Sequence, residues 1–414
     1  MLLLDCELYP LSMRRYLIIL AIAIVVIGLA AAAYFLFFAN TATVAVTSTG
    51  STGSLPTAGQ SAPTATATSS TLAGGQPANS PSAVSSRLTE IAAGPVVPGE
   101  AVTDTLATAS SSGDTTVHYI DRESGNVYAY SESAGQTTRT SNRTIPGIER
   151  AFWSPDGMTA FVQYLSGNDF STVNTYGLPS NGAGGFFLPQ NFSGLAVSST
   201  SVLALASGVN GSSASLYHLD GSSAGASFTT PLSALRVAPA GKGRYLVFTK
   251  PSSLMSGYAY LVNAQGQFSR IAGPLNGLVA LPSPDGKWAL ISSSSSGVLH
   301  LSLVDLATGA STALPVTTIA DKCVWASDSA TAYCGIPNSP SASYMYPDDW
   351  YQGAASFNDQ LWKIDAAGRY AALVLDFTKA TGHTLDAEAL AVDQEKTALV
   401  FVNKNDGSLW SYKL

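Results

Sequence analysis

A short phrase recurs along this sequence and limits what the chain can fold into. Residues 152–157 read FWSPDG, residues 281–290 repeat the phrase as LPSPDGKWAL, and residues 324–329 carry a degenerate copy, VWASDS. Proline presets φ for a turn, an aspartate side chain can cap it, and glycine adopts the backbone conformation that other residues resist. Each copy therefore predicts two strands joined by a tight turn. We interpret the turn residues as structural: Ser154, Pro155, Asp156, Gly157, Ser283, Pro284, Asp285 and Gly286.

Short alternating strands separated by Gly, Ser, Asn and Asp fill residues 87–414. Such spacing is typical of an all-β sandwich, barrel or propeller, and the internal repeat favours the propeller. The last unit, at 387–413, has three strands where a blade normally has four, and residues 87–91 resemble the fourth strands elsewhere. We therefore predict an all-β, seven-bladed β-propeller closed by an N-terminal strand, with six or eight blades as alternatives. The seven units are expected at 117–140, 149–187, 194–228, 234–271, 278–314, 323–375 and 387–413.

The third strands share a second phrase. It reads GNVY at 125–128, SLY at 215–217, QLWKID at 360–365 and GSLW at 407–410. Together with the Ser-Pro-Asp-Gly turns, it resembles the TolB-like and WD-repeat-like β-propellers of bacteria. The segments 346–353 and 401–404 also look like a group of single-span, membrane-anchored bacterial propeller proteins. The TolB resemblance implies protein–protein contact in the cell envelope, although no TolB-like amino-terminal domain is recognisable here.

The amino terminus predicts a membrane anchor. Tyr16 to Phe38 is a run of 23 residues without a charge. As a helix it spans about 34 Å, enough for a bilayer core of about 30 Å. Arg14 and Arg15 precede it and nothing basic follows until Arg87, so the positive-inside rule places residues 1–15 in the cytoplasm and the rest outside. A cleaved signal peptide remains the alternative, although its apolar core is normally shorter.

Between the anchor and the strands lies a linker at 39–86, rich in Ser, Thr, Ala, Gly and Pro and free of charge. Such a composition cannot bury enough apolar surface to order itself, so we expect a disordered tether for a folded domain at 87–414. The chain as a whole carries a net charge of −7 and has no cluster of Lys or Arg. These features exclude nucleic acid as a partner, because phosphate binding requires a basic face.

Two cysteines flank the third turn. Cys323 and Cys334 are expected on adjacent antiparallel strands, opposite or nearly opposite one another. Outside the cytoplasm such a pair can oxidise if the Cα atoms lie within about 7 Å. A disulfide and a pair of buried thiols are therefore the two alternatives.

The longest interruption of the strand pattern, at 338–357, is the candidate binding loop. Exposed aromatic and acidic side chains on a loop suit recognition of a sugar or a protein, but the same residues can also pack as a plug over a blade. Asp348 and Asp349 can also coordinate a cation, although two ligands are too few to predict a metal site. The candidate binding residues are Tyr344, Tyr346, Asp348, Asp349, Trp350 and Tyr351.

No arrangement of residues predicts catalysis, a metal or a cofactor. The four histidines are scattered, and the Gly-x-Ser-x-Gly match at 221–225 lies between strands, whereas a nucleophile elbow needs a strand-to-helix turn. We expect a non-enzymatic, membrane-anchored propeller outside the cytoplasm that binds an envelope protein or surface polymer. The alternatives are a glycan-acting enzyme that uses carboxylates such as Asp348 and Asp349, and a structural surface spacer.

Overall fold

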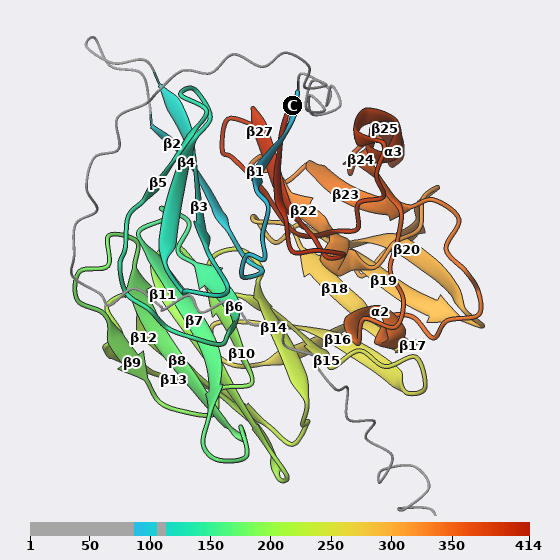
Figure 1. The fold of residues 1–414 in the computed structure, drawn as a ribbon. Helices are drawn as coiled ribbons and strands as arrows, with labels where there is room; N and C mark the ends of the chain where they lie inside the picture. The colour runs from blue at the N-terminus through green and yellow to red at the C-terminus, as the bar shows by residue number, and fades with distance from the viewer. Residues whose placement is uncertain (1–86, 106–112) are drawn as a thin grey trace, which may run out of the picture. The chain divides into compact units, whose positions relative to one another are not determined.

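A computed structural model describes residues 87–105 and 113–414. These residues form seven four-stranded sheets, each an antiparallel blade whose strands follow one another in the chain, except in the last blade (Figure 1). The seven-bladed propeller predicted from the sequence is confirmed. Blades 1 to 3 contain β2 (Ala101–Thr105), β3 (Asp114–Ile120), β4 (Val127–Ser131) and β5 (Gln136–Arg139); β6 (Ile148–Trp153), β7 (Thr159–Ser166), β8 (Thr172–Pro179) and β9 (Phe186–Leu188); and β10 (Gly194–Val197), β11 (Ser201–Gly208), β12 (Gly211–His218) and β13 (Ser223–Thr230).

The remaining four blades complete the ring, and three short helical segments lie in their connections. Blades 4 and 5 contain β14 (Leu235–Pro239), β15 (Tyr245–Thr249), β16 (Ser256–Val262) and β17 (Phe268–Asn276); and β18 (Val279–Pro282), β19 (Trp288–Ser295), β20 (Val298–Asp305) and β21 (Ser311–Ala313). Blade 6 contains β22 (Cys323–Trp325), β23 (Thr331–Pro337), β24 (Asp359–Asp365) and β25 (Tyr370–Asp376). Blade 7 contains β26 (Ala387–Val392), β27 (Ala398–Asn403), β28 (Leu409–Lys413) and β1 (Leu88–Ala92). The helical segments are η1 (Ala320–Lys322), α2 (Asp348–Tyr351) and α3 (Phe377–Thr381).

The amino-terminal strand closes the ring, as the sequence predicts. β1 pairs antiparallel with β28, and Leu88 lies opposite Tyr412. Arg87 stacks over the ring of Tyr412 at 4.9 Å and donates a hydrogen bond to the carbonyl of Lys413 at 2.8 Å. The outer edge of β28 is therefore paired by β1, the strand that precedes the first blade, and hydrogen bonds between these two strands join the first and last blades.

In blades 2 to 7 the second strand contains at least four consecutive buried residues, because blades pack against each other through their sheet faces. All six residues of β27 are buried, as are all seven of β23. Their sequences accordingly read as nearly continuous apolar runs instead of alternating patterns. The outermost strands contrast with them, and every residue of β5 is exposed.

The Ser-Pro-Asp-Gly turns connect first and second strands through side-chain hydrogen bonds. Ser154 donates to Asp156 at 2.5 Å and accepts from the backbone of Thr159 at 3.0 Å. Gly157 has a φ of 68°, which is accessible to glycine at little cost. Ser283 and Asp285 repeat the arrangement at 2.7 Å. The recurring phrase is thus a turn that fixes the pairing of two strands.

One strand departs from the expected units. The sequence placed the start of the first blade at residue 117, whereas β2 begins at Ala101 and β3 at Asp114. The sequence of β2, AVTDT, has no apolar run, because only its first two residues are buried. It was therefore not distinguishable from a loop.

The two cysteines of blade 6 stand directly opposite each other in the register of β22 and β23. Their Cα atoms are 4.0 Å apart and a disulfide joins Cys323 to Cys334. The predicted anchor at 16–38 and linker at 39–86 lie outside the described residues. Among the residues that are described, no helix is long and apolar enough to span a membrane.

Candidate functional site

On one face of the propeller lie the first residues of the innermost strands. The connections between the second and third strands of each blade lie on the same face. We call it the upper face. The β23–β24 connection, at 338–358, is the longest on this face and includes α2. The opposite, lower face carries the Ser-Pro-Asp-Gly turns. Because the upper face gathers the irregular segments, it is the natural place for a site.

The structure divides the six candidate residues of the loop into buried and exposed groups. Tyr346 and Trp350 are only 1% and 3% exposed, respectively, and pack beneath the loop. Asp348 accepts a hydrogen bond from the backbone of Ser253 at 2.5 Å, and Asp349 accepts one from the backbone of Met345 at 2.7 Å. These contacts correspond to the packing alternative. Tyr344 and Tyr351 remain exposed at 37% and 38%.

A buried ionic cluster supports the loop from below. The carboxylate of Asp386 accepts from the indole of Trp350 at 3.0 Å and from the backbone of Phe357 at 2.9 Å. The ammonium of Lys322 pairs with Asp386 and, at 2.7 Å, with Asp359. It also lies 4.9 Å from the centre of the Trp350 ring. All three charged side chains are fully buried, so each depends on the others for compensation.

Burial and charge act in opposite directions on this cluster. Burial alone would lower the pKa of Lys322, but the carboxylates of Asp359 and Asp386 raise it above its ordinary value. Burial raises the pKa of Asp359 to about 6, although Lys322 opposes the change. Lys322 is therefore held in its charged form.

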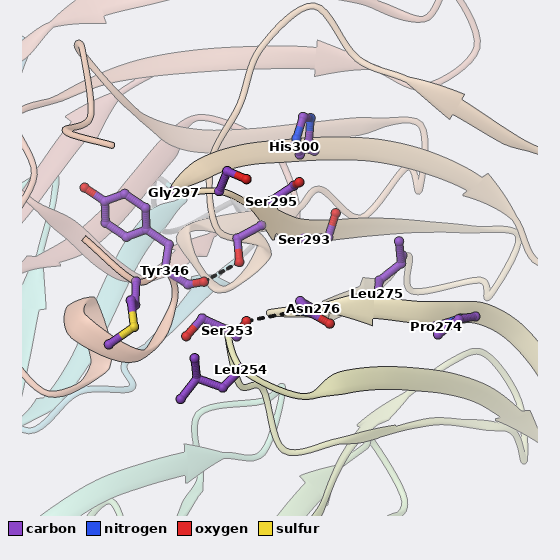
Figure 2. A pocket seen from close by; sticks show the side chains of 13 residues that line it. Ser253, Leu254, Pro274, Leu275, Asn276, Ser293, Ser295, Gly297, His300 and Tyr346 are labelled. Carbon is purple, nitrogen blue, oxygen red and sulfur yellow. Dashed lines mark hydrogen bonds between the residues drawn. The ribbon is translucent and has the colours of Figure 1, made fainter. Parts of the chain in front are cut away.

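A groove of about 680 Å³ opens beside the loop, between blades 4 and 5. Figure 2 shows Leu275 and Asn276 of β17 on one side and Ser293, Ser295 and His300 of the β19–β20 hairpin on the other. Four separate segments thus build it: the β15–β16 connection, the end of β17, the β19–β20 hairpin and the β23–β24 connection. No single stretch of sequence contains enough of the groove to predict it.

The groove combines a hydroxyl-rich floor with an apolar rim. Ser294 donates to the carbonyl of Tyr346 at 2.5 Å, which fixes the loop to blade 5 (Figure 2). Asn276 donates to the carbonyl of Ser253 at 3.1 Å. On the rim, the exposed fractions of Leu254 and Met345 are 76% and 49%. We call Leu254, Leu275 and Met345 the apolar rim.

A second group of side chains, the axial cluster, lies over the propeller axis. It consists of Arg150 on β6, Arg236 on β14, Asp321 in η1 and Tyr351 in α2. Arg236 donates two hydrogen bonds to the carboxylate of Asp321, at 2.7 and 3.0 Å, and so reaches from blade 4 past blade 5 to blade 6. The hydroxyl of Tyr351 donates to Asp321 at 2.7 Å and accepts from Arg236 at 3.0 Å. One predicted loop residue, Tyr351, therefore belongs to this cluster.

The basic members of the axial cluster were not among the predicted site residues, although the repeat contains a signal for them. In blades 2, 4 and 6, the turn after the innermost strand begins with a residue whose backbone N–H donates a hydrogen bond across the turn. These residues are Ser154, Ala240 and Ala326. Counting four residues back from these positions gives Arg150, Arg236 and Lys322. Basic residues thus occupy one equivalent position in alternate blades, 2, 4 and 6. Aligning the blades by their turns would have revealed the pattern.

A buried acid lies at the junction of blades 1 and 7. Glu100 is 9% exposed, and neither of its carboxylate oxygens has a hydrogen-bond partner among the residues that the structure describes. Burial, followed by the negative charge of Glu388 on β26, raises the pKa of Glu100 well above its ordinary value. Burial also raises the pKa of Glu388, against the positive charges of Lys404, Lys322 and Arg122.

Within residues 87–105 and 113–414, no group of three or more His, Cys, Asp or Glu side chains is placed to hold a metal ion. The adjacent Asp348 and Asp349 contact different backbone amides, one on blade 4 and one in their own loop.

The comparisons with known proteins show no relation closer than the fold described above. No family model matches the sequence, and no curated protein matches it. Among solved structures, the fold is similar to an oligogalacturonate lyase in complex with manganese, with 12% identity over 77% of this chain and 98% of that chain, at a TM-score of 0.48. A streptogramin B lyase structure covers 78% of this chain and 96% of its own at 10% identity and a TM-score of 0.49. The propeller domain of the Trilobed protease from Pyrococcus furiosus matches 75% of this chain and 93% of its own length, at 9% identity and a TM-score of 0.47. Identities this low concern the fold alone, and the chain is a seven-bladed β-propeller.

Proposed function

We propose that this protein is a non-catalytic binding scaffold that engages an envelope protein or surface polymer through the upper face of its propeller. In this proposal, the apolar run Tyr16 to Phe38 anchors it to the cell membrane and the linker carries the propeller outside the cytoplasm. The groove with its apolar rim is the observation that supports the binding role. Exposed apolar side chains gathered at a groove are typical of interaction sites.

Exposing the apolar side chains of the rim to water is energetically unfavourable. Leu254 has 76% of its surface exposed and Met345 has 49%, and both side chains line the groove. Burying apolar surface stabilises a complex by about 25 cal/mol per Å² before the entropy of association is subtracted. The hydroxyl groups of Ser293 and Ser295 and the ring of His300 add hydrogen-bonding groups that can set the orientation of a partner.

A further feature favours a scaffold over a carboxylate enzyme. Asp348 and Asp349, the residues that the enzyme alternative would use, are hydrogen-bonded to backbone amides and serve to hold the loop. The resemblance to TolB-like propellers agrees with a partner in the envelope.

Affinity capture from crosslinked membranes tests the proposal. The full-length chain is compared with Leu254→Ser/Met345→Ser, which removes the rim, and with Met158→Ser as a matched control. Met158 is 59% exposed in the lower-face turn after Gly157, so its replacement removes a similar exposed side chain from the other face. The proposal expects a discrete captured species that is lost with the rim variant and retained with the control.

Two results would contradict it. Capture that is equal for all three chains, or absent from the unaltered one, would leave the spacer alternative. Turnover of a glycan by the purified chain that Asp348→Asn abolishes would establish the enzyme alternative instead.

A further inference from the structure

The axial cluster has an excess of positive charge. Arg236 and Asp321 neutralise each other through a two-pronged ion pair. Glu149, the other acid near Arg150, pairs with Arg122 at 3.3 Å. Among residues 87–105 and 113–414, no carboxylate lies within ion-pair distance of Arg150. The cluster of two guanidiniums and one carboxylate thus keeps one positive charge without a partner.

The two arginines stand at the same level of the ring, on the innermost strands of blades 2 and 4. Arg150 and Arg236 hold equivalent positions on their inner strands, four residues before the turn. Burial among the surrounding side chains, and then the positive charge of Arg236, lower the pKa of Arg150. Arg150 is nevertheless exposed, and the side chain of Arg236 is 35% exposed. Water and small solutes therefore reach both groups.

Arg236 is held in place before any ligand arrives. Asp321 takes two of its donors, the hydroxyl of Tyr351 accepts a third bond, and the ring of Phe248 lies 5.2 Å from its guanidinium carbon. A guanidinium fixed in this way loses little rotamer entropy when it binds. Arg150 supplies the second guanidinium, with five donors in a planar fork.

We propose that Arg150 and Arg236 form a receptor for a single oxyanion, a carboxylate or a phosphate, over the axis of the propeller. Paired guanidinium forks match the oxygen geometry of both groups, and charge-assisted hydrogen bonds of this kind are about twice as strong as neutral ones. Asp321 is itself a carboxylate that Arg236 binds, so it shows the kind of group that this guanidinium recognises. The receptor is distinct from the groove, and its test involves no partner protein.

Thermal unfolding of the purified full-length chain in detergent measures the binding directly. Inorganic phosphate and acetate are titrated separately, with sodium chloride holding the ionic strength constant, and the rise in Tm gives a Kd for each anion. We expect saturable stabilisation by at least one of them, and the anion that saturates identifies the ligand class. Arg150→Gln should weaken that Kd about ten- to hundred-fold, because it removes a charged hydrogen-bonding partner. Arg150→Lys, which keeps the charge and loses the fork, should lie between.

Two more variants check the assignment. Asp321→Asn removes the carboxylate charge that competes with the anion for Arg236, and it should lower the Kd of the anion. Arg139→Gln, on the fully exposed β5, is the matched control and should leave it unchanged. The proposal is overturned if neither anion gives saturable stabilisation, if Arg150→Gln leaves both Kd values unchanged, or if Asp321→Asn weakens them.

A labelling experiment covers the case in which Arg150→Gln does not fold. Phenylglyoxal modifies accessible arginines, and peptide mass spectrometry reads each site separately. Phosphate or acetate should protect Arg150 in the unaltered chain while Arg139 stays reactive. Equal labelling of Arg150 with and without the anions would contradict the receptor.

Discussion

Replacing Asp386 by alanine should loosen the β23–β24 connection, which lies on the upper face. The carboxylate of Asp386 contacts Lys322, the indole of Trp350 and the backbone of Phe357, and all of these groups are buried. The substitution leaves the ammonium of Lys322 with Asp359 alone and removes an acceptor from two donors. Both consequences act on the same connection, at 338–358.

The magnitude follows from the burial of the pair. Breaking a buried ion pair by removing one partner costs about 3–5 kcal/mol, because the remaining charge stays uncompensated. With an unfolding entropy of about 2 cal/mol/K per residue, a domain of this size should lose about 5–7 °C in Tm. An exposed pair offers the matched control. Lys379 lies 3.0 Å from Asp376 with 82% of its side chain exposed, and Lys379→Ala should cost less than about 1 kcal/mol.

Differential scanning calorimetry of both variants measures the difference. The chain has six tryptophans, so the contribution of Trp350 to the emission is obtained by comparing each variant with and without Trp350→Phe. We expect Asp386→Ala to lower Tm several times more than Lys379→Ala and to shift tryptophan emission to longer wavelength. Equal, small shifts in Tm for the two variants would refute the reasoning, because they would mean that the buried cluster contributes no more than a surface pair.

Three further predictions concern other parts of the ring. Because the pKa of Glu100 is raised in the folded chain from an ordinary value of 4.5, the folded state binds this proton more tightly, and stability falls as the pH rises from 4.5 towards the folded-state pKa. Glu100→Gln should therefore stabilise the protein at pH 8 and not at pH 4 in urea unfolding, whereas an equal effect at both would contradict the assignment. Reduction of the Cys323–Cys334 bond, which links residues 11 apart, should cost about 2–3 kcal/mol, and a Cys323→Ser/Cys334→Ser variant should show no response to reductant in the same assay. Deletion of residues 87–92 removes β1 and exposes the edge of β28, so we expect self-association in light scattering, and a monomer of unchanged Tm would argue against closure by this strand.

Features that repeat locally were predictable from the sequence. The turns at Asp156 and Asp285 fix their strand pairs through side chains within six residues, and local contacts of this kind leave a mark in the sequence. Ring closure was predictable because a unit of three strands has an obvious missing partner. β2 was missed because its short, threonine-rich sequence carries no apolar pattern.

The site was less predictable because its residues meet only through the fold. The loop aromatics were identified, yet the burial of Trp350 depends on Asp386, which lies 36 residues further along the chain. Arg236 and Asp321 are 85 residues apart. Their contact depends on the number of blades between them and not on any local pattern.

Photo-crosslinking in intact cells tests the central claim, binding through the upper face, most directly. A benzoylphenylalanine residue is placed at Leu254 on the apolar rim or at Met158 on the lower face, and both positions are highly exposed. The account predicts an adduct of discrete mass from position 254 and none of that mass from position 158. The absence of an adduct at 254, or the same adduct from both positions, would contradict it.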